Sequence, residues 1–338
     1  MKTYGLKVRI LIQLTLATVL LLGAFLFSSY HSRQKHTIND VVGVIDAVET
    51  LFASQLKSDA IMMGAVLDVL LRDEQLKAAM RDRDKKKLFE GTITLFGELH
   101  SGHGITHLYF TGPDRVNLLR VHKPDKHGDE IDRFTMLEAE KTGRTSYGIE
   151  LGPLGTFTLR VVEPWYDGEQ LIGYVELGEE IEHITQSLHN TLSVEIYVII
   201  DKNFLDRDGW ETGMRMLGRD ARWNRFPSVV IVDQTLDVFP ESLVPFLDEE
   251  HHTSKITDVK VSLNDRHYRS RFIHLYDAGG QSVGDMVVMT DVTEIVSGFW
   301  STFFLVCAIC VAVGGFLFVF SYVLIWRNKA VTDKKTGS

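Results

Sequence analysis

Two long apolar stretches lie near the two ends of the chain. Residues 10–28 and 299–326 contain no Asp, Glu, Lys or Arg, and as helices both are long enough to cross a hydrocarbon core of about 30 Å. The second stretch carries aromatic residues at both ends, as is typical of the two interfaces of a membrane-spanning helix. For the first stretch a retained anchor is favoured over a cleaved signal peptide, because the apolar run is long and no small-residue cleavage site follows it.

Helical periodicity continues after the first stretch. Hydrophobic residues recur at alternating spacings of three and four, the pattern of a coiled-coil seam: Ile38, Val41, Ile45, Val48 and Phe52. This pattern predicts a long stalk helix that continues from the membrane span. Two interpretations of the stripe are open, namely that it pairs with a second copy in a homodimer, or that it is core within one chain. A second, highly charged helix is predicted over residues 73–99, interrupted by the charged run 81–87.

From Gly104 onward the pattern becomes typical of strands, bounded by turn residues. The predicted hairpins are 105–110 with 116–122 and 156–166 with 170–177; further strands are predicted at 194–200, 229–232, 255–263, 267–276 and 282–289, and helices at 133–141, 179–191, 203–216 and from 240. A gapless shift of 111 residues lays 157–181 over 268–292, with Arg160 on Arg271. Such a repeat predicts a duplicated module. We therefore expect an α+β fold of two modules in series, each an antiparallel sheet backed by helices.

The charges indicate a membrane protein with an acidic middle part. The 36 Lys and Arg residues are outnumbered by 45 Asp and Glu residues, so the net charge is −9, which argues against a nucleic-acid partner. Both short tails outside the apolar stretches are basic, and the positive-inside rule places both in the cytoplasm. Residues 29–298 are then extracytoplasmic, and the protein is a two-pass protein of the cytoplasmic membrane.

The sequence offers little chemistry beyond binding. Both cysteines, Cys307 and Cys310, lie inside the second apolar stretch and are interpreted as small apolar residues of a membrane helix. His100, His103 and His107 have a spacing that could hold a metal, but glycines interrupt a helix there, so no metal site and no cofactor are expected. No catalytic motif is found, and we expect no enzyme activity.

Two segments carry a resemblance to a known family. The stretches LYFTGPDRVNLLRVHKPDKHGDEIDRF (108–134) and ELGPLGTFTLRVVEPWYDGEQLIGYVELGEEI (150–181) resemble the double-Cache extracellular sensor domains of bacterial transmembrane receptors, in the subfamily described as the double sensory domain of two-component sensor kinases. The resemblance implies a stalk helix and two tandem PAS-like (Cache) modules. It also implies that the membrane-distal module takes up a small ligand, and that a homodimer transmits a small helix movement across the membrane.

These expectations together define the domain plan. We expect a cytoplasmic tail at 1–9, a transmembrane helix at 10–28, stalk and packing helices at 29–99, a membrane-distal Cache module at 100–182, a membrane-proximal Cache module at 183–292, a second transmembrane helix at 299–326 and a cytoplasmic tail at 327–338. The last tail is too short for an output domain. The expected output is therefore a separate cytoplasmic protein or an output domain missing from this chain.

The resemblance also points to ligand-binding residues. Amino-acid-binding relatives carry an Arg followed shortly by Trp-Tyr, and that Arg takes the ligand carboxylate. Here Arg133 is retained and the Trp-Tyr pair is replaced, which leaves a small carboxylate as the expected ligand. A guanidinium suits this role because it donates two parallel hydrogen bonds to a carboxylate.

Four further residues are candidates for the same site. Arg120 and His122 alternate onto one side of their strand, and Tyr109 lies on the neighbouring strand. The alternatives are that Arg120 pairs with a local acid such as Asp125, Asp129 or Asp132 and that Tyr109 is core. Arg160 ranks below Arg133, because its repeat partner is also an Arg. Protonation of His122 at mildly acidic pH is expected to strengthen binding.

The expected function is a transmembrane signal-transduction receptor that senses a small ligand. Ligand binding is expected to close the distal module, shift the strand 282–289 and pass the movement through 291–297. The alternative is a membrane-anchored interaction module that docks a periplasmic partner protein without a small ligand. A polar pocket that contains arginines favours the sensor, whereas an exposed apolar patch favours the docking module.

Overall fold

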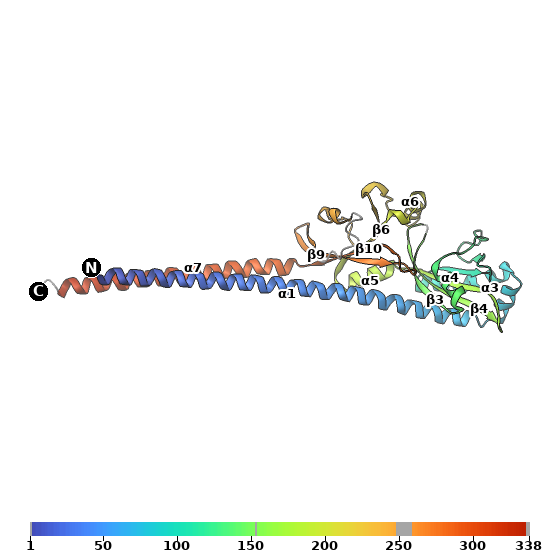
Figure 1. Cartoon of the computed structure of the whole chain (residues 1–338), viewed down its shortest axis with the longest axis horizontal. Helices are drawn as coiled ribbons and strands as arrows, with labels where there is room; N and C mark the ends of the chain where they lie inside the picture. Colours follow the sequence, from blue (N-terminus) through green and yellow to red (C-terminus); the bar gives the residue numbers. More distant parts are fainter. Residues whose placement is uncertain (1, 153, 248–258, 336–338) are drawn as a thin grey trace. The chain divides into compact units, whose positions relative to one another are not determined.

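The computed structural model describes residues 2–152, 154–247 and 259–335, with only part of the side chains in the two long terminal helices. The chain divides into two compact units, and Figure 1 labels their elements. One unit comprises residues 1–43 and 291–338, and the other comprises residues 44–290.

The first unit is helical. Helix α1 (Lys2–Leu70) runs without interruption through the first apolar stretch and on into the second unit, and α7 (Thr293–Lys335) contains the second apolar stretch. Among the residues that the structure describes, one stretch, Thr293–Phe316, has the length and mean hydropathy (2.2) needed to span a membrane. This stretch overlaps the second predicted span. The first, 10–28, is not confirmed, and part of its side chains lie outside the described residues.

The second unit contains two five-stranded antiparallel sheets with the same strand order. The first sheet consists of β1 (Ile105–Thr111), β2 (Asn117–Arg120), β3 (Ser146–Leu151), β4 (Phe157–Asp167) and β5 (Gln170–Glu180), in the order β2-β1-β5-β4-β3. The second consists of β6 (Val194–Asp201), β7 (Val229–Gln234), β8 (Val259–Leu263), β9 (Arg266–Tyr276) and β10 (Ser282–Asp291), in the order β7-β6-β10-β9-β8. The identical order confirms the duplicated α+β module; we call the two copies the first and the second module.

The remaining helices are short. They are α2 (Glu74–Arg81), α3 (Lys85–His103), α4 (Phe134–Thr142), α5 (Glu182–Leu192) and α6 (Arg207–Met216), with 3₁₀ turns at Lys202–Phe204, Trp223–Arg225 and Glu241–Phe246. The helix predicted over 73–99 breaks within the predicted interruption at 81–87, so that it forms the two helices α2 and α3. Asp84 caps a new N-terminus by accepting a hydrogen bond from the Lys87 amide (3.1 Å), and Arg83 before it has a positive φ of 53°, a conformation that ends a helix.

Three sequence-based expectations need adjustment. Strand β3 was not predicted, because Gly148 and Glu150 interrupt its apolar pattern. The helix expected from 240 is a 3₁₀ turn that contains Pro245. The strand predicted from 255 is described only from Val259, since residues 248–258 lie outside the described residues.

The part of α1 in the second unit packs along the modules. Ile45, Val48, Met63 and Leu67 are completely buried within one chain, so at these positions the apolar stripe is intramolecular core, the second of the two open interpretations. Asp46 of α1 forms an ion pair with Arg271 of β9 (3.6 Å). Further along the helix, Asp59 contacts His183 of α5 (3.1 Å), the helix between the two sheets, so α1 contacts the second module and the junction between the modules.

Both sheets lead into a helix through their central strand. Strand β5 ends at Glu180, and α5 begins two residues later at Glu182. Strand β10 ends at Asp291, and α7 begins two residues later at Thr293. One residue therefore separates a central strand from the helix that follows it in each module.

Candidate functional site

One face of the first sheet collects the predicted ligand-binding residues. Tyr109 of β1 lies directly opposite Arg120 of β2 and Glu176 of β5, and directly opposed residues share a sheet face. Glu176 also lies opposite Val162, two residues from Arg160 on β4. Helix α4 covers this face, because Met136 and Ala139 pack against Val162 and Tyr174. Arg133, the residue before α4, thereby reaches the same face.

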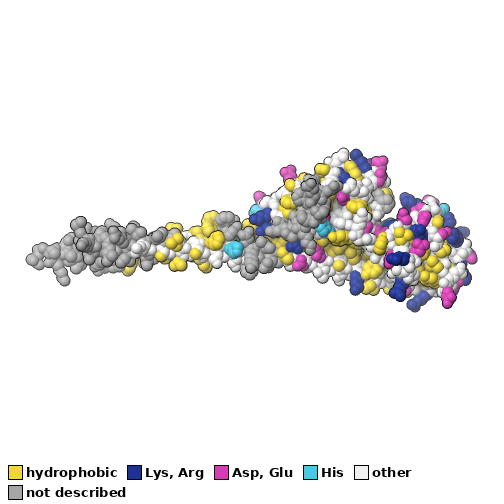
Figure 2. Space-filling model, viewed as in Figure 1, with side chains coloured by type: hydrophobic (Ala, Val, Ile, Leu, Met, Phe, Trp, Pro, Cys, Tyr) yellow, Lys and Arg dark blue, Asp and Glu magenta, His cyan; other side chains and the backbone are white. Residues whose placement is uncertain are grey.

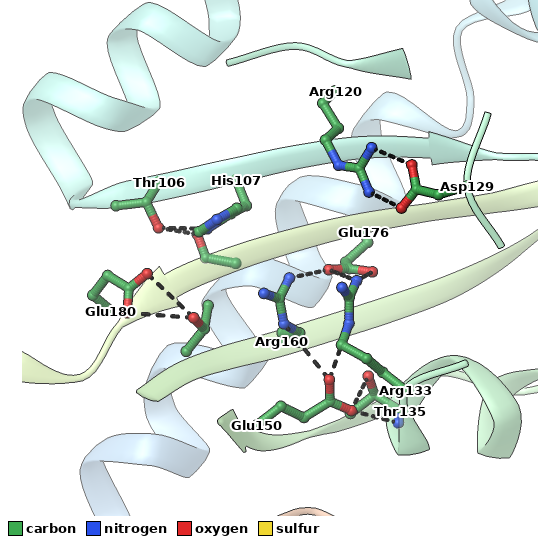
Figure 3. A network of polar contacts seen from close by, with 12 residues as sticks. Thr106, His107, Arg120, Asp129, Arg133, Thr135, Glu150, Arg160, Glu176 and Glu180 are labelled. Atoms are coloured by element: carbon green, nitrogen blue, oxygen red, sulfur yellow. Dashed lines mark hydrogen bonds and ion pairs between the residues drawn. The ribbon is translucent and has the colours of Figure 1, made fainter. Parts of the chain in front are cut away.

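Two buried carboxylates hold two of the arginines (Figure 3). The Arg133 Nη2 atom donates to both Glu176 oxygens at 2.8 Å, and Arg160 donates to the same carboxylate. The Arg133 Nε atom lies 3.1 Å from Glu150 Oε2. Glu150 in turn accepts hydrogen bonds from the amide and the hydroxyl of Thr135, both at 2.8 Å. The start of α4 is thus fixed to β3 and β5 by charged hydrogen bonds.

The two carboxylates respond differently to burial. Burial opposes ionisation of Glu176, yet Arg133 and Arg160 together hold its pKa below the usual value. Burial raises the pKa of Glu150, although the Thr135 amide and Arg133 partly offset this effect. Glu176 is therefore the charged partner that compensates the buried arginines.

Arg120 is paired with a local acid, the alternative raised from the sequence. Its Nη1 and Nη2 atoms donate to the two Asp129 oxygens at 2.7 and 2.6 Å, and Nη1 also donates to the Lys126 carbonyl at 2.9 Å. The hydrogen bond from Arg120 lowers the pKa of Asp129 to about 2. The Arg120 side chain is 4% exposed, whereas that of Asp129 is 46% exposed. Asp129 is therefore the partner that solvent can reach.

Tyr109 is the centre of the site. The guanidinium carbons of Arg120, Arg133 and Arg160 lie 4.8, 5.5 and 5.9 Å from the centroid of its buried ring, within the range of cation–π interactions. His122 stacks on the same ring at 5.4 Å with an interplanar angle of 22°. All five residues predicted from the sequence are thus brought together around one aromatic ring.

The histidines of the site are uncharged at neutral pH. Desolvation and the neighbouring guanidiniums lower the pKa of His122 to about 4, although part of this residue is exposed at the surface. The ring of His107 lies 4.7 Å from that of His122, and burial lowers the pKa of His107 to about 2. The expectation that His122 gains a proton at mildly acidic pH is therefore wrong, because desolvation and the nearby charges of Arg120 and Arg160 lower its pKa.

Arg160 and Arg271, which the gapless shift of 111 residues aligns, do not occupy equivalent positions in the two modules. Asp167 pairs with Gln170 in the first hairpin, whereas the Asp277 amide donates to the Gln281 carbonyl in the second. The second loop is one residue longer, so the gapless shift aligns each residue of β4 with a β9 residue one position away from its structural equivalent. Arg271 contacts Asp46 of α1, and Arg160 contacts Glu176 on the face that α4 covers. The repeat therefore gives no reason to rank Arg160 below Arg133.

Several buried polar atoms on this face have no hydrogen-bond partner among the described residues. They include the Nε atoms of Arg120, Arg133 and Arg160, the Tyr174 hydroxyl, the Thr111 hydroxyl and both side-chain polar atoms of Asn117. Thr111 lies opposite both Asn117 and Tyr174, so these three side chains form one row across three strands. Buried polar groups normally have partners, and this row lies next to the row that contains Tyr109.

Sequence analysis missed two carboxylates of the site. Glu176 is a charged residue within a strand that is otherwise almost entirely buried, and such a residue requires a charged partner. Glu150 lies on the strand that was not predicted. Of the histidines considered as metal ligands, His100 instead makes a hydrogen bond with the Ile105 carbonyl (2.9 Å).

The arginine site around Tyr109 is not part of a broad basic surface. Basic and acidic side chains are interspersed over the face of the modules drawn in Figure 2. Two cavities, of about 510 Å³ and 800 Å³, lie among other residues. The smaller one is lined by α6, β7 and the segment between them, and the larger one by α1, β3 and β9. The arginine site is a compact network within the first module.

Comparison with known proteins agrees with this architecture. Residues 45–208 match the family described as "Double sensory domain of two-component sensor kinase". No curated protein sequence matches the chain.

Similar solved structures include the sensor domain of the histidine kinase DctB from Vibrio cholerae (11% identity, 76% of this chain and 98% of that one, TM-score 0.46). The periplasmic domain of Vibrio cholerae LuxQ is similar at 13% identity, over 74% of this chain and 99% of that one, with a TM-score of 0.44. The ligand-binding domain of the Campylobacter jejuni chemoreceptor Tlp3, in complex with 4-methylisoleucine, matches at 11% identity over 72% of this chain and 94% of that one, with a TM-score of 0.33. The family match covers the last part of the stalk helix, the first module and the start of the second, and it supports a double-Cache sensor domain in this part of the chain.

Proposed function

We propose that the protein is a transmembrane receptor whose first module binds a small ligand with a carboxylate group. The observation that carries this proposal is the convergence of three guanidinium groups on the Tyr109 ring. The Nε atom of Arg120 also lacks a hydrogen-bond partner among the described residues. The family match supports a sensory rather than a catalytic role.

The ligand carboxylate exchanges with Asp129 on Arg120. Asp129 is the partly exposed partner of a buried arginine, whereas Glu176 is completely buried between Arg133 and Arg160. Exchange of Asp129 therefore leaves the buried network intact and keeps Arg120 paired. The unpartnered row of Thr111, Asn117 and Tyr174 supplies hydrogen bonds to a further polar group of the ligand.

The receptor has two membrane spans, with both termini in the cytoplasm and residues 29–298 outside. The exposed apolar side chains of Leu20, Leu21 and Phe25 in α1, and of Phe304 and Val311 in α7, support two lipid-facing helices. The first module is then membrane-distal and the second membrane-proximal. The signal passes from β10 into α7 and reaches a cytoplasmic output protein or output domain.

The receptor acts as a homodimer through the exposed side of α1. Five exposed residues, Leu51, Ser54, Ser58, Ile61 and Ala65, follow the alternating three-four spacing of a helix-pairing seam. Because Ile45 and Val48 are buried within one chain, this outer stripe replaces the stripe that we expected from the sequence.

The test uses the full chain in detergent. A thermal-shift screen with mono- and dicarboxylates and amino acids identifies a ligand, and calorimetry then gives its affinity. We expect Arg120→Ala to weaken binding by about ten- to a hundredfold, since a hydrogen bond to a charged group contributes about 1.5–3 kcal/mol. The matched control is Arg81→Ala, which removes an exposed arginine that pairs with Asp167. A ligand that binds Arg133→Ala and Arg120→Ala as tightly as the unmodified chain contradicts the proposed site.

A further inference from the structure

Three potential metal ligands from three elements meet outside the arginine site. Asp59 comes from α1, Glu179 from the end of β5 and His183 from the first turn of α5. One ligand atom of each lies within 4.8 Å of the others. We propose that this cluster binds a divalent first-row transition metal, of which Zn²⁺ fits the ligand set best.

The distances fit one ion shared by the three side chains. His183 Nε2 lies 3.1 Å from Asp59 Oδ2 and 3.4 Å from Glu179 Oε1. Two ligands of a tetrahedral zinc ion, each about 2.0–2.2 Å from the metal, are about 3.3–3.6 Å apart. Both distances from His183 are therefore close to those of a shared ion.

The surrounding hydrogen bonds orient two of the ligands. His183 Nδ1 makes a hydrogen bond with the Glu180 carbonyl at 2.9 Å, which places the ring proton on Nδ1 and directs the Nε2 lone pair to the carboxylates. Gln55 donates to the other Asp59 oxygen, Oδ1, at 2.9 Å. Contacts of this kind, which fix the tautomer of a histidine and the position of a carboxylate, are typical of metal sites.

Glu179 provides an independent observation. Glu179 is 5% exposed, and its Oε2 atom is buried without a hydrogen-bond partner among the described residues. A proton on His183 Nε2 would provide a partner for Asp59 Oδ2 and Glu179 Oε1, but Glu179 Oε2 would still have none. A metal ion that binds the Glu179 carboxylate compensates the whole buried group.

The ligand types determine the class of metal. Imidazole together with carboxylates suits zinc and its neighbours, whereas magnesium and calcium prefer oxygen ligands alone. The cluster supplies three protein ligands, and water completes the coordination. Gly104 lies next to the cluster, where a Cβ atom would come within 3.2 Å of Glu179 Oε1, so glycine leaves space around this carboxylate.

The bound metal connects α1 to the junction between the modules. Strand β5 is the central strand of the first sheet, and α5 leads into β6 of the second. A metal that joins Asp59 to Glu179 and His183 thus restrains this junction against the stalk helix.

The experiment uses the full chain without a histidine tag, purified in detergent, stripped with a chelator and titrated with Zn²⁺. Elemental analysis after dialysis gives the stoichiometry, and competition with a chromophoric chelator gives the affinity. We expect one Zn²⁺ per chain at this site, and an affinity lowered at least tenfold by Asp59→Asn and by His183→Ala. Co²⁺ in place of Zn²⁺ reports the same site by its visible absorption, which His183→Ala removes.

The matched control is His189→Ala, on the same helix, whose ring contacts the Val194 carbonyl and Glu195 rather than the cluster. This variant retains the affinity and the Co²⁺ spectrum. The unfolding temperatures of the metal-free variants report whether each variant is folded. The proposal is overturned if Zn²⁺ does not bind saturably to the unmodified chain, or if Asp59→Asn and His183→Ala bind it unchanged, in which case the cluster is an ion pair only.

Discussion

Arg160 and Glu176 form a buried ion pair between neighbouring strands, β4 and β5, and their side chains are 4% and 0% exposed. Removal of one partner of such a pair leaves a buried charge without compensation and costs about 3–5 kcal/mol. We expect Glu176→Gln to lower the free energy of unfolding in urea by this amount. Asp129→Asn, at the half-exposed pair with Arg120, is the control and should cost much less. Equal losses for the two variants would show that burial does not govern the energy of these pairs.

Variants of Arg120 and Asp129 should change ligand affinity in opposite directions. Arg120→Ala removes the donor and should weaken binding by about ten- to a hundredfold. Asp129→Asn removes the negative charge that competes for the guanidinium, so a carboxylate ligand should bind more tightly to this variant. Isothermal titration of both variants with one ligand makes the comparison. Weaker binding to Asp129→Asn would mean that Asp129 contacts the ligand rather than competes with it.

The two histidines of the site should each lower the stability as the pH falls below about 6.5. His107 and His122 have folded-state pKa values of about 2 and about 4, below the value near 6.5 of an unfolded chain. Between these values the unfolded state binds more protons than the folded state, so the free energy of unfolding falls with falling pH. His107→Gln should flatten this dependence in urea titrations at pH 4.5 to 7.5, whereas His127→Gln, at a histidine outside the site, should leave it unchanged. A pH dependence of His107→Gln equal to that of the unmodified chain would contradict the assignment.

Glu180 should have the opposite pH dependence. Burial raises its pKa to about 7, and its carboxyl group accepts a hydrogen bond from the Thr158 hydroxyl. Its contribution to stability is fully present below about pH 4.5 and is lost as the pH rises through about 7. We expect Glu180→Gln to be more stable than the unmodified chain at pH 8, with a smaller difference at pH 5. Glu169→Gln is the control, because it removes a carboxylate from the exposed turn between β4 and β5.

Cysteine crosslinking distinguishes the two faces of α1. If the homodimer uses the exposed stripe, Ser58→Cys and Ile61→Cys should each form a disulfide-linked dimer readily in membranes. Val48→Cys should not, because Val48 is completely buried within its own chain. Efficient crosslinking at Val48 together with none at Ile61 would place the dimer contact on the other face of the helix.

The fold was largely predictable because its hairpins have strong local signals. The turn Asp167-Gly168 and the alternating strands beside it determine the longest hairpin, β4 with β5, without tertiary information. Strand β3 was missed because Glu150 and Gly148 break the apolar pattern, and only the pairing with β4 makes this segment a strand. Glu150 belongs to the site, so the missed strand and the missed carboxylate have the same cause.

The arginines of the site were predictable from residue type and spacing, but their partners were not. The sequence shows several acids near Arg120, yet only the folded loop selects Asp129. Glu176 lies 43 residues from Arg133, and the two meet because β5 is the central strand of its sheet. The same limit applies to the repeat, since one extra residue in a turn moved Arg271 out of register with Arg160.

The single residue between a central strand and its following helix has a mechanical consequence. A central strand is hydrogen-bonded on both sides, so β10 cannot slide without carrying β6 and β9 with it. Val292 alone, itself buried, separates that strand from α7, and one buried residue cannot absorb a displacement as a flexible linker would. In the signalling route that we propose, a movement of the second sheet would reach α7 through this one residue, and a glycine-rich insertion at this position should uncouple the two.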